Sequence, residues 1–113
     1  MPTYIDTHLG DTGTATATAG AATLHKHSGK ITSEALTTAA GANYTLTLTN
    51  QKISAKSIVL ASVDQGTNTT EGIDVQRVTP GANQVVIVVR NTHASAALNG
   101  TIVISFAVIN KAV

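Results

Sequence analysis

Between Asn43 and Thr49 the chain alternates strictly between larger apolar residues and threonine, and this pattern constrains the fold more than any other feature. Tyr44, Leu46 and Leu48 fall on one side of an extended chain, and the threonines fall on the other. A period of two predicts a strand with one buried face. The 19 threonines among 113 residues favour extended structure more widely, because their branched Cβ atoms pack well on a pleated surface.

Apolar segments of this kind recur about every ten residues from Thr23 onward, with turn residues between them. The predicted strands cover residues 24–31 (interrupted at Ser28 and Gly29), 43–49, 57–63, 73–76, 84–90 and 101–109. In the last of them we expect Ile102, Ile104, Phe106 and Val108 to face the core. Residues 79–83 predict a turn in which Pro80 fixes φ and Gly81 supplies a positive φ. No window of ten residues has convincing helical periodicity. Residues 23–113 are therefore predicted to form an all-β, antiparallel β-sandwich.

Two of the predicted strands are apolar on both faces. The segments 58–63 and 85–89 carry more contiguous apolar surface than one thin sandwich can cover. Such strands are usually central in a sheet or covered by a neighbouring subunit. We therefore expect a homo-oligomer, with a trimer as the leading state.

Residues 1–22 differ from the rest, because the repeat of Thr and Ala at 14–19 carries no large apolar side chain. This segment is predicted to be an extended N-terminal arm that is mobile in the free protein and becomes ordered on a partner. Its alternating Thr and Ala can also pair as a strand, which would make eight strands in all. Tyr4, Ile5 and Leu9 are the predicted partner-binding anchors, with strand addition to an exposed sheet edge as the binding mode.

Composition argues against several classes of partner. Charged residues make up 12% of the chain and the net charge is +1, which gives no electrostatic footprint for nucleic acid or an anionic membrane. Aromatic residues are 3%, so the core must consist mainly of Val, Ile, Leu and Ala. Cysteine is absent, which excludes disulfides and thiolate chemistry. The first residues lack the pattern of a signal peptide, and we expect synthesis in a cytoplasm without export.

Two histidines raise the question of a metal site. His25 and His27 lie at i and i+2, on one face of an extended chain, where a third ligand such as His8 or His93 could complete a set. The favoured interpretation is that they are exposed polar residues, and no metal is predicted. A symmetry axis that brings histidines of several subunits together stays open.

Other candidate sites are weaker. Asp64, Glu71 and Asp74 surround one polar segment, where they are expected to solvate the loop, and their spacing matches no known calcium loop. Serine, histidine and aspartate are present without a Gly-x-Ser-x-Gly elbow. We therefore expect no catalytic activity and no cofactor.

Three segments carry a family resemblance: KITSEALTTAAGANYTLTLTN at 30–50, VTPGAN at 78–83 and NGTIVISF at 99–106. They resemble the small β-rich virion proteins of tailed bacteriophages, especially head decoration or cement proteins, over about residues 23–110. The resemblance implies a β-sandwich, often of jelly-roll type, on the outer surface of a capsid. It also implies a role in clamping neighbouring major capsid protein subunits, commonly as a homotrimer.

Two other functions are alternatives to capsid decoration. A tail, fibre or adhesion module that binds a receptor or glycan should expose aromatic residues on a loop, but the chain has no Trp and two Tyr. An enzyme of cupin-like form needs histidines and carboxylates on inward strand positions, and His25 with His27 does not supply them.

Overall fold

The computed structural model describes residues 11–110, which form strands and connecting loops without a helix. A helix able to cross a membrane is therefore also absent from this part of the chain. In chain order the strands are β1 (Thr12–Thr16), β2 (Ala21–Thr23), β3 (Ser28–Thr32), β4 (Asn43–Thr49), β5 (Ile58–Gln65), β6 (Ile73–Gly81), β7 (Gln84–Asn91) and β8 (Ile102–Ile109). The predicted all-β class is confirmed.

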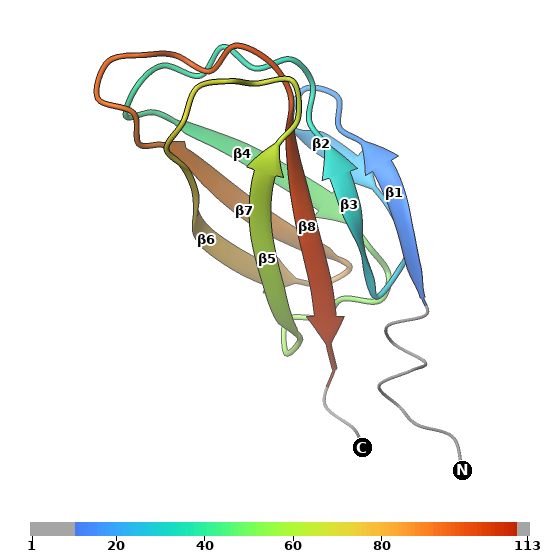
Figure 1. The fold of residues 1–113 in the computed structure, drawn as a ribbon. Coiled ribbons are helices and arrows are strands. Elements are labelled where there is room, and N and C mark those ends of the chain that lie inside the picture. Colours follow the sequence, from blue (N-terminus) through green and yellow to red (C-terminus); the bar gives the residue numbers. More distant parts are fainter. Residues whose placement is uncertain (1–10, 111–113) are drawn as a thin grey trace.

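The strands form two four-stranded sheets that pack together as a sandwich (Figure 1). Sheet A has the order β1-β3-β8-β5, and sheet B has the order β2-β4-β7-β6. The pairs β1–β3 and β2–β4 are parallel, and the other neighbours are antiparallel. The jelly-roll connectivity is not confirmed, because jelly rolls belong to the antiparallel architectures.

The core between the sheets is aliphatic, as the composition predicts. In β4 the residues Tyr44, Leu46 and Leu48 are buried, which confirms the face assigned from the alternation. In β8 the four residues expected to face inward are all buried, namely Ile102, Ile104, Phe106 and Val108. The period-two pattern therefore identified the inner faces of both sheets at their central strands.

The structure differs from the expected arm over residues 11–22. β1 lies in sheet A, where its five residues pair in parallel with β3, and β2 pairs in parallel with β4. Ala17, between them, is 2% exposed and donates its N–H to the Thr32 carbonyl at 2.8 Å. The Thr and Ala repeat is incorporated because small side chains suffice where the backbone hydrogen bonds to an existing strand.

The Glu34 carboxylate adds hydrogen bonds to the β2–β4 ladder that holds this N-terminal region in sheet B. Glu34 accepts hydrogen bonds from the Gly20 N–H at 2.9 Å and from the Tyr44 hydroxyl at 2.8 Å. Burial and the Glu34 carboxylate raise the pKa of the Tyr44 hydroxyl. The contact joins the β1–β2 connection, the segment after β3, and β4 into one unit.

The two strands that are apolar on both faces have different positions. β7 is an inner strand of sheet B between β4 and β6, as predicted, and Val88 on its outer side is also buried. β5 is an edge strand of sheet A, not a central one. Of the two alternatives given for such a strand, the central position does not apply to β5, whose outward apolar side chains are exposed, and cover by a neighbouring subunit stays a prediction.

The turn between β6 and β7 lies within the predicted segment 79–83, but its positive φ is not supplied by Gly81 as expected. Pro80 and Gly81 belong to β6, and the positive φ of 60° is that of Asn83. Asparagine tolerates this left-handed conformation because its short polar side chain can hydrogen-bond locally. The turn residues are Ala82 and Asn83, directly after Gly81.

Long loops gather at one end of the sandwich (Figure 1). Residues 33–42, 66–72 and 92–101 meet there, and Leu36 forms an isolated bridge with Gly100. Asn68 accepts the Asn99 N–H at 2.8 Å and so connects two of these loops. At the opposite end β1 begins and β8 ends, beside the 50–57 loop and the β6–β7 turn.

Candidate functional site

The outer face of sheet A is a surface of small, mostly uncharged side chains. The strand register places on this face Thr12, Thr14, Thr16, Ser28, Lys30, Thr32, Ile58, Leu60, Ser62, Asp64, Val103, Ser105, Ala107 and Ile109. Lys30 and Asp64 are its charged members, and the Lys30 ammonium donates to the Ser105 hydroxyl at 2.9 Å. Hydroxyl and methyl groups therefore dominate a face with few charges to solvate.

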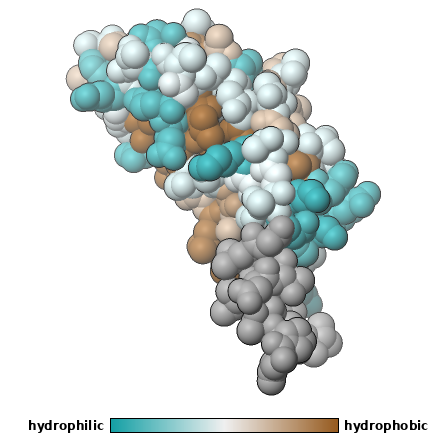
Figure 2. Space-filling view, turned by 45° about the vertical axis from the view of Figure 1, so that its right-hand side comes forward, coloured by the Kyte–Doolittle hydropathy of each residue, from teal (hydrophilic) through white to brown (hydrophobic). Residues whose placement is uncertain are grey.

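One corner of this face is apolar. Ile58 is 59% exposed, Leu60 is 56% exposed and Ile109 is 46% exposed, and these are the large hydrophobic residues that are exposed among residues 11–110. Ile58 and Ile109 are register partners, and Leu60 pairs with Ala107. We call Ile58, Leu60 and Ile109 the apolar corner. Apolar surface also reaches the exterior between polar areas in the space-filling view (Figure 2).

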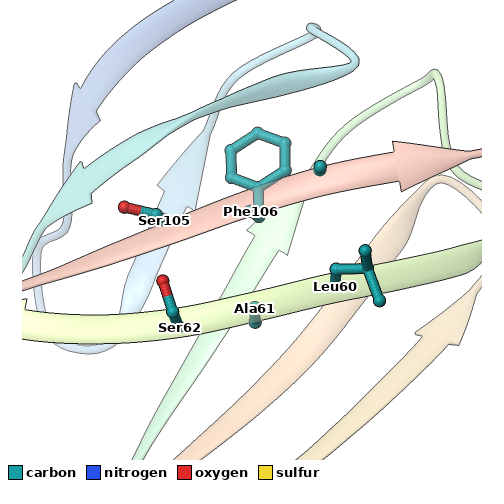
Figure 3. A pocket seen from close by; sticks show the side chains of 6 residues that line it. Leu60, Ala61, Ser62, Ser105 and Phe106 are labelled. Atoms are coloured by element: carbon teal, nitrogen blue, oxygen red, sulfur yellow. The ribbon is translucent and has the colours of Figure 1, made fainter. Parts of the chain in front are cut away.

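A shallow hollow lies beside the apolar corner, across β5 and β8. Its volume is about 260 Å³, and it is lined by Leu60, Ala61, Ser62, Ser105, Phe106 and Ala107. Figure 3 shows the Leu60 side chain and the Ser62 and Ser105 hydroxyls arranged along the two neighbouring strands. Such an open, shallow shape fits a side chain of another protein better than an enclosed small molecule.

The two histidines weighed as possible metal ligands, His25 and His27, have other contacts. His25 Nδ1 accepts the Gln51 N–H at 3.0 Å, and His27 Nδ1 lies 2.7 Å from Asp11 Oδ2. His93 Nδ1 accepts the N–H groups of Ser95 and Ala96 in the β7–β8 loop. Within residues 11–110 no group of three or more His, Asp or Glu side chains could hold a metal ion.

Asp11 is the centre of a small charged cluster at the start of β1. Its carboxylate accepts the His27 backbone N–H at 3.1 Å and lies 3.5 Å from the Lys26 ammonium. The hydrogen bond with the His27 side chain is the main cause that lowers the pKa of Asp11. The cluster attaches the start of β1 to the residues just before β3.

The remaining predicted site residues do not form a site in the described residues. Asp64, Glu71 and Asp74 are all exposed, around the end of β5 and the start of β6, as expected for loop solvation. Tyr4, Ile5, Leu9 and His8 lie outside residues 11–110, so their predicted roles stay predictions.

Sequence reasoning identified the apolar run of β5 but missed the apolar corner. In the sequence, Ile109 is only the last residue of the predicted strand 101–109. Its pairing with Ile58 joins residues that are 51 positions apart in the chain. The available signal was that Ile58 and Leu60 share one strand face, whereas Val59, Ala61 and Val63 share the other. Which face was open depended on the position of β5 in the sheet.

Comparison with known proteins finds no matching family model, no matching curated protein and no matching solved structure.

Proposed function

We propose that this chain is a non-enzymatic structural module that acts by binding other protein subunits through the outer face of sheet A. The observation that carries the proposal is the apolar corner. Three large aliphatic side chains are exposed to solvent on one face, and the other residues of that face are mostly small and uncharged. Exposed apolar groups of this kind mark interaction surfaces, because covering them removes apolar area from water.

The rest of the described molecule supports a structural role. Every buried side-chain nitrogen or oxygen in residues 11–110 has a hydrogen-bond partner. The histidine nitrogens at positions 25 and 93 accept backbone N–H groups, which uses them in shaping loops. These side chains therefore contribute to the structure of the loops. Their hydrogen bonds account for histidines that could otherwise be taken for catalytic or metal-binding residues.

Within this class, we propose the decoration of a bacteriophage capsid, where the chain stabilises contacts between major capsid protein subunits. This assignment rests on the resemblance of segments 30–50, 78–83 and 99–106 to head decoration proteins. The two-sheet sandwich and the weakly charged outer face of sheet A agree with it. The protein would then be a virion component at the capsid surface.

Immunogold electron microscopy tests the location. Antibodies against the purified chain are applied to intact particles of the phage whose genome encodes it, and to particles from a deletion mutant as the control. Labelling of the head surface is the expected result. Labelling confined to the tail or fibres would support an adhesion module instead, and unlabelled particles would contradict a virion role.

A further inference from the structure

The β7–β8 loop contains Asn99–Gly100, a pair of residues that is prone to spontaneous deamidation. Asn99 is the one asparagine of the sequence that is followed by glycine. In such a pair the glycine nitrogen can attack the asparagine Cγ, because glycine has no side chain to hinder the approach. The Cγ–Nδ2 bond then breaks, ammonia leaves with the proton of the glycine nitrogen, and a succinimide forms. Water opens the succinimide to aspartate or isoaspartate, which makes asparagine one of the thermolabile residues of proteins.

The packing of the loops requires glycine at position 100. A Cβ atom added there would lie 2.5 Å from Thr67 Oγ1 and 2.8 Å from the Asn68 nitrogen, which is closer than Cβ atoms approach other atoms in proteins. Gly100 is also buried, and its carbonyl accepts the Leu36 N–H at 2.9 Å in the isolated bridge. A larger residue that would slow the reaction therefore does not fit, so the fold itself demands the susceptible pair.

The side chain of Asn99 is held at both of its polar atoms. Its Oδ1 accepts the Thr69 N–H at 2.8 Å, and its Nδ2 donates to the Thr69 hydroxyl at 2.8 Å. The Asn99 backbone N–H donates to Asn68 Oδ1, also at 2.8 Å. The Cγ must turn toward the Gly100 nitrogen for a succinimide to form, and this movement breaks both bonds to Thr69. The bond to Asn68 and the bridge to Leu36 oppose the accompanying rotation of the backbone.

We propose that Asn99 is a deamidation site that the folded loops suppress, and that it reacts only when loops 66–72 and 92–101 open locally. The rate then follows the population of the opened state. An isoaspartate routes the main chain through the side-chain Cβ, which inserts an additional carbon before Gly100 and moves this residue from its close packing against Thr67. Opening of the loops is thereby converted into a covalent change that prevents the original packing from forming again. This chemistry does not depend on the function proposed above.

Peptide mass spectrometry of the full chain tests the suppression, because replacing an amide by a carboxyl group changes the mass of the peptide that contains residue 99. At mildly alkaline pH, folded wild-type protein should deamidate at Asn99 at least about tenfold more slowly than the same chain unfolded in urea. Asn99→Asp is the control, and its peptide should show no change in mass under either condition. Equal rates in the folded and unfolded protein, or no reaction in urea, would overturn the proposal.

Thr69→Val tests the hydrogen bond to the Asn99 side chain separately. Thr69 is exposed, and valine keeps the backbone N–H but removes the hydroxyl that accepts from Asn99 Nδ2. Loss of this bond should make deamidation of the folded protein about fivefold faster and leave the rate in urea unchanged. Thr69→Ser should restore the slow rate, and Thr45→Val, at an exposed position of β4, should react as wild type does. A rate in folded Thr69→Val equal to that of wild type would overturn the protection assigned to Thr69.

Discussion

At the scale of single residues, buried asparagines shape the ends of the strands. Asn50 and Asn91 are both 0% exposed, and each follows or ends a strand of sheet B. In each case the side-chain oxygen accepts the N–H two residues further on, at Lys52 and His93. Sequence showed that both strands end on asparagine before a loop. The sequence could not show that the side-chain Nδ2 of each asparagine donates to main-chain carbonyls of the loops.

Asn91 gives a direct test of this interpretation. Its Nδ2 donates to the carbonyls of Thr38 and Ala96 at 3.1 and 2.8 Å, which ties two loops together at the end of the sandwich. Asn91→Ala removes the partner of the Ala96 carbonyl and of the His93 N–H, whereas the Thr38 carbonyl keeps the Leu98 N–H, and the change is expected to lower the free energy of unfolding by about 2–4 kcal/mol. Urea denaturation measures the change. Asn43→Ala, at an exposed position, is the control and should stay within about 0.5 kcal/mol of wild type.

At the scale of secondary structure, the central strands were predictable and β1 was not. The bounds of β4 match the predicted segment 43–49, because its burial follows from its own alternation. β1 is stabilised instead by its ladder to β3 and by Ala17, which is buried in the core. Those contacts depend on segments elsewhere in the chain. A low-complexity segment therefore predicted an arm where the structure has a strand.

The attachment of β1 should depend on acid pH. The hydrogen bond from His27 lowers the pKa of Asp11 below its usual value of 3.8, so its carboxylate stabilises the folded state above that value. This contribution is lost as pH falls through the lowered pKa. We expect amides of β1 to exchange faster than those of β4 at the lowest pH, after correction for intrinsic exchange rates.

Asp11→Asn isolates the carboxylate. In this variant β1 should already be less protected at neutral pH, and its protection should change little on acidification. Asp74→Asn, at an exposed position in β6, is the matched control and should behave as wild type. Equal acid sensitivity of β1 in wild type and Asp11→Asn would contradict the role given to this cluster.

At the scale of the whole molecule, the sequence predicted the fold class better than the candidate site. Period-two alternation and regular turn spacing suffice for an all-β sandwich, because they act along the chain. The site is defined by strand order, which places β5 at an edge and brings Ile109 beside Ile58. The apolar run at 58–63 suggests contact with another subunit, and the exposed Ile58, Leu60 and Ile109 identify the outer face of sheet A as the side on which that contact is proposed.

The central claim is that the molecule binds other protein subunits through the apolar corner on the outer face of sheet A, and the binding of purified variants to phage particles that lack the chain tests it most directly. Leu60→Lys places a charge on a side chain that is 56% exposed, so the fold is expected to be retained. The account predicts that Leu60→Lys binds the particles at least about tenfold more weakly than wild type, whereas Thr45→Lys, at an exposed position on β4 of sheet B, binds as wild type does. Equal binding of wild type and Leu60→Lys would contradict it.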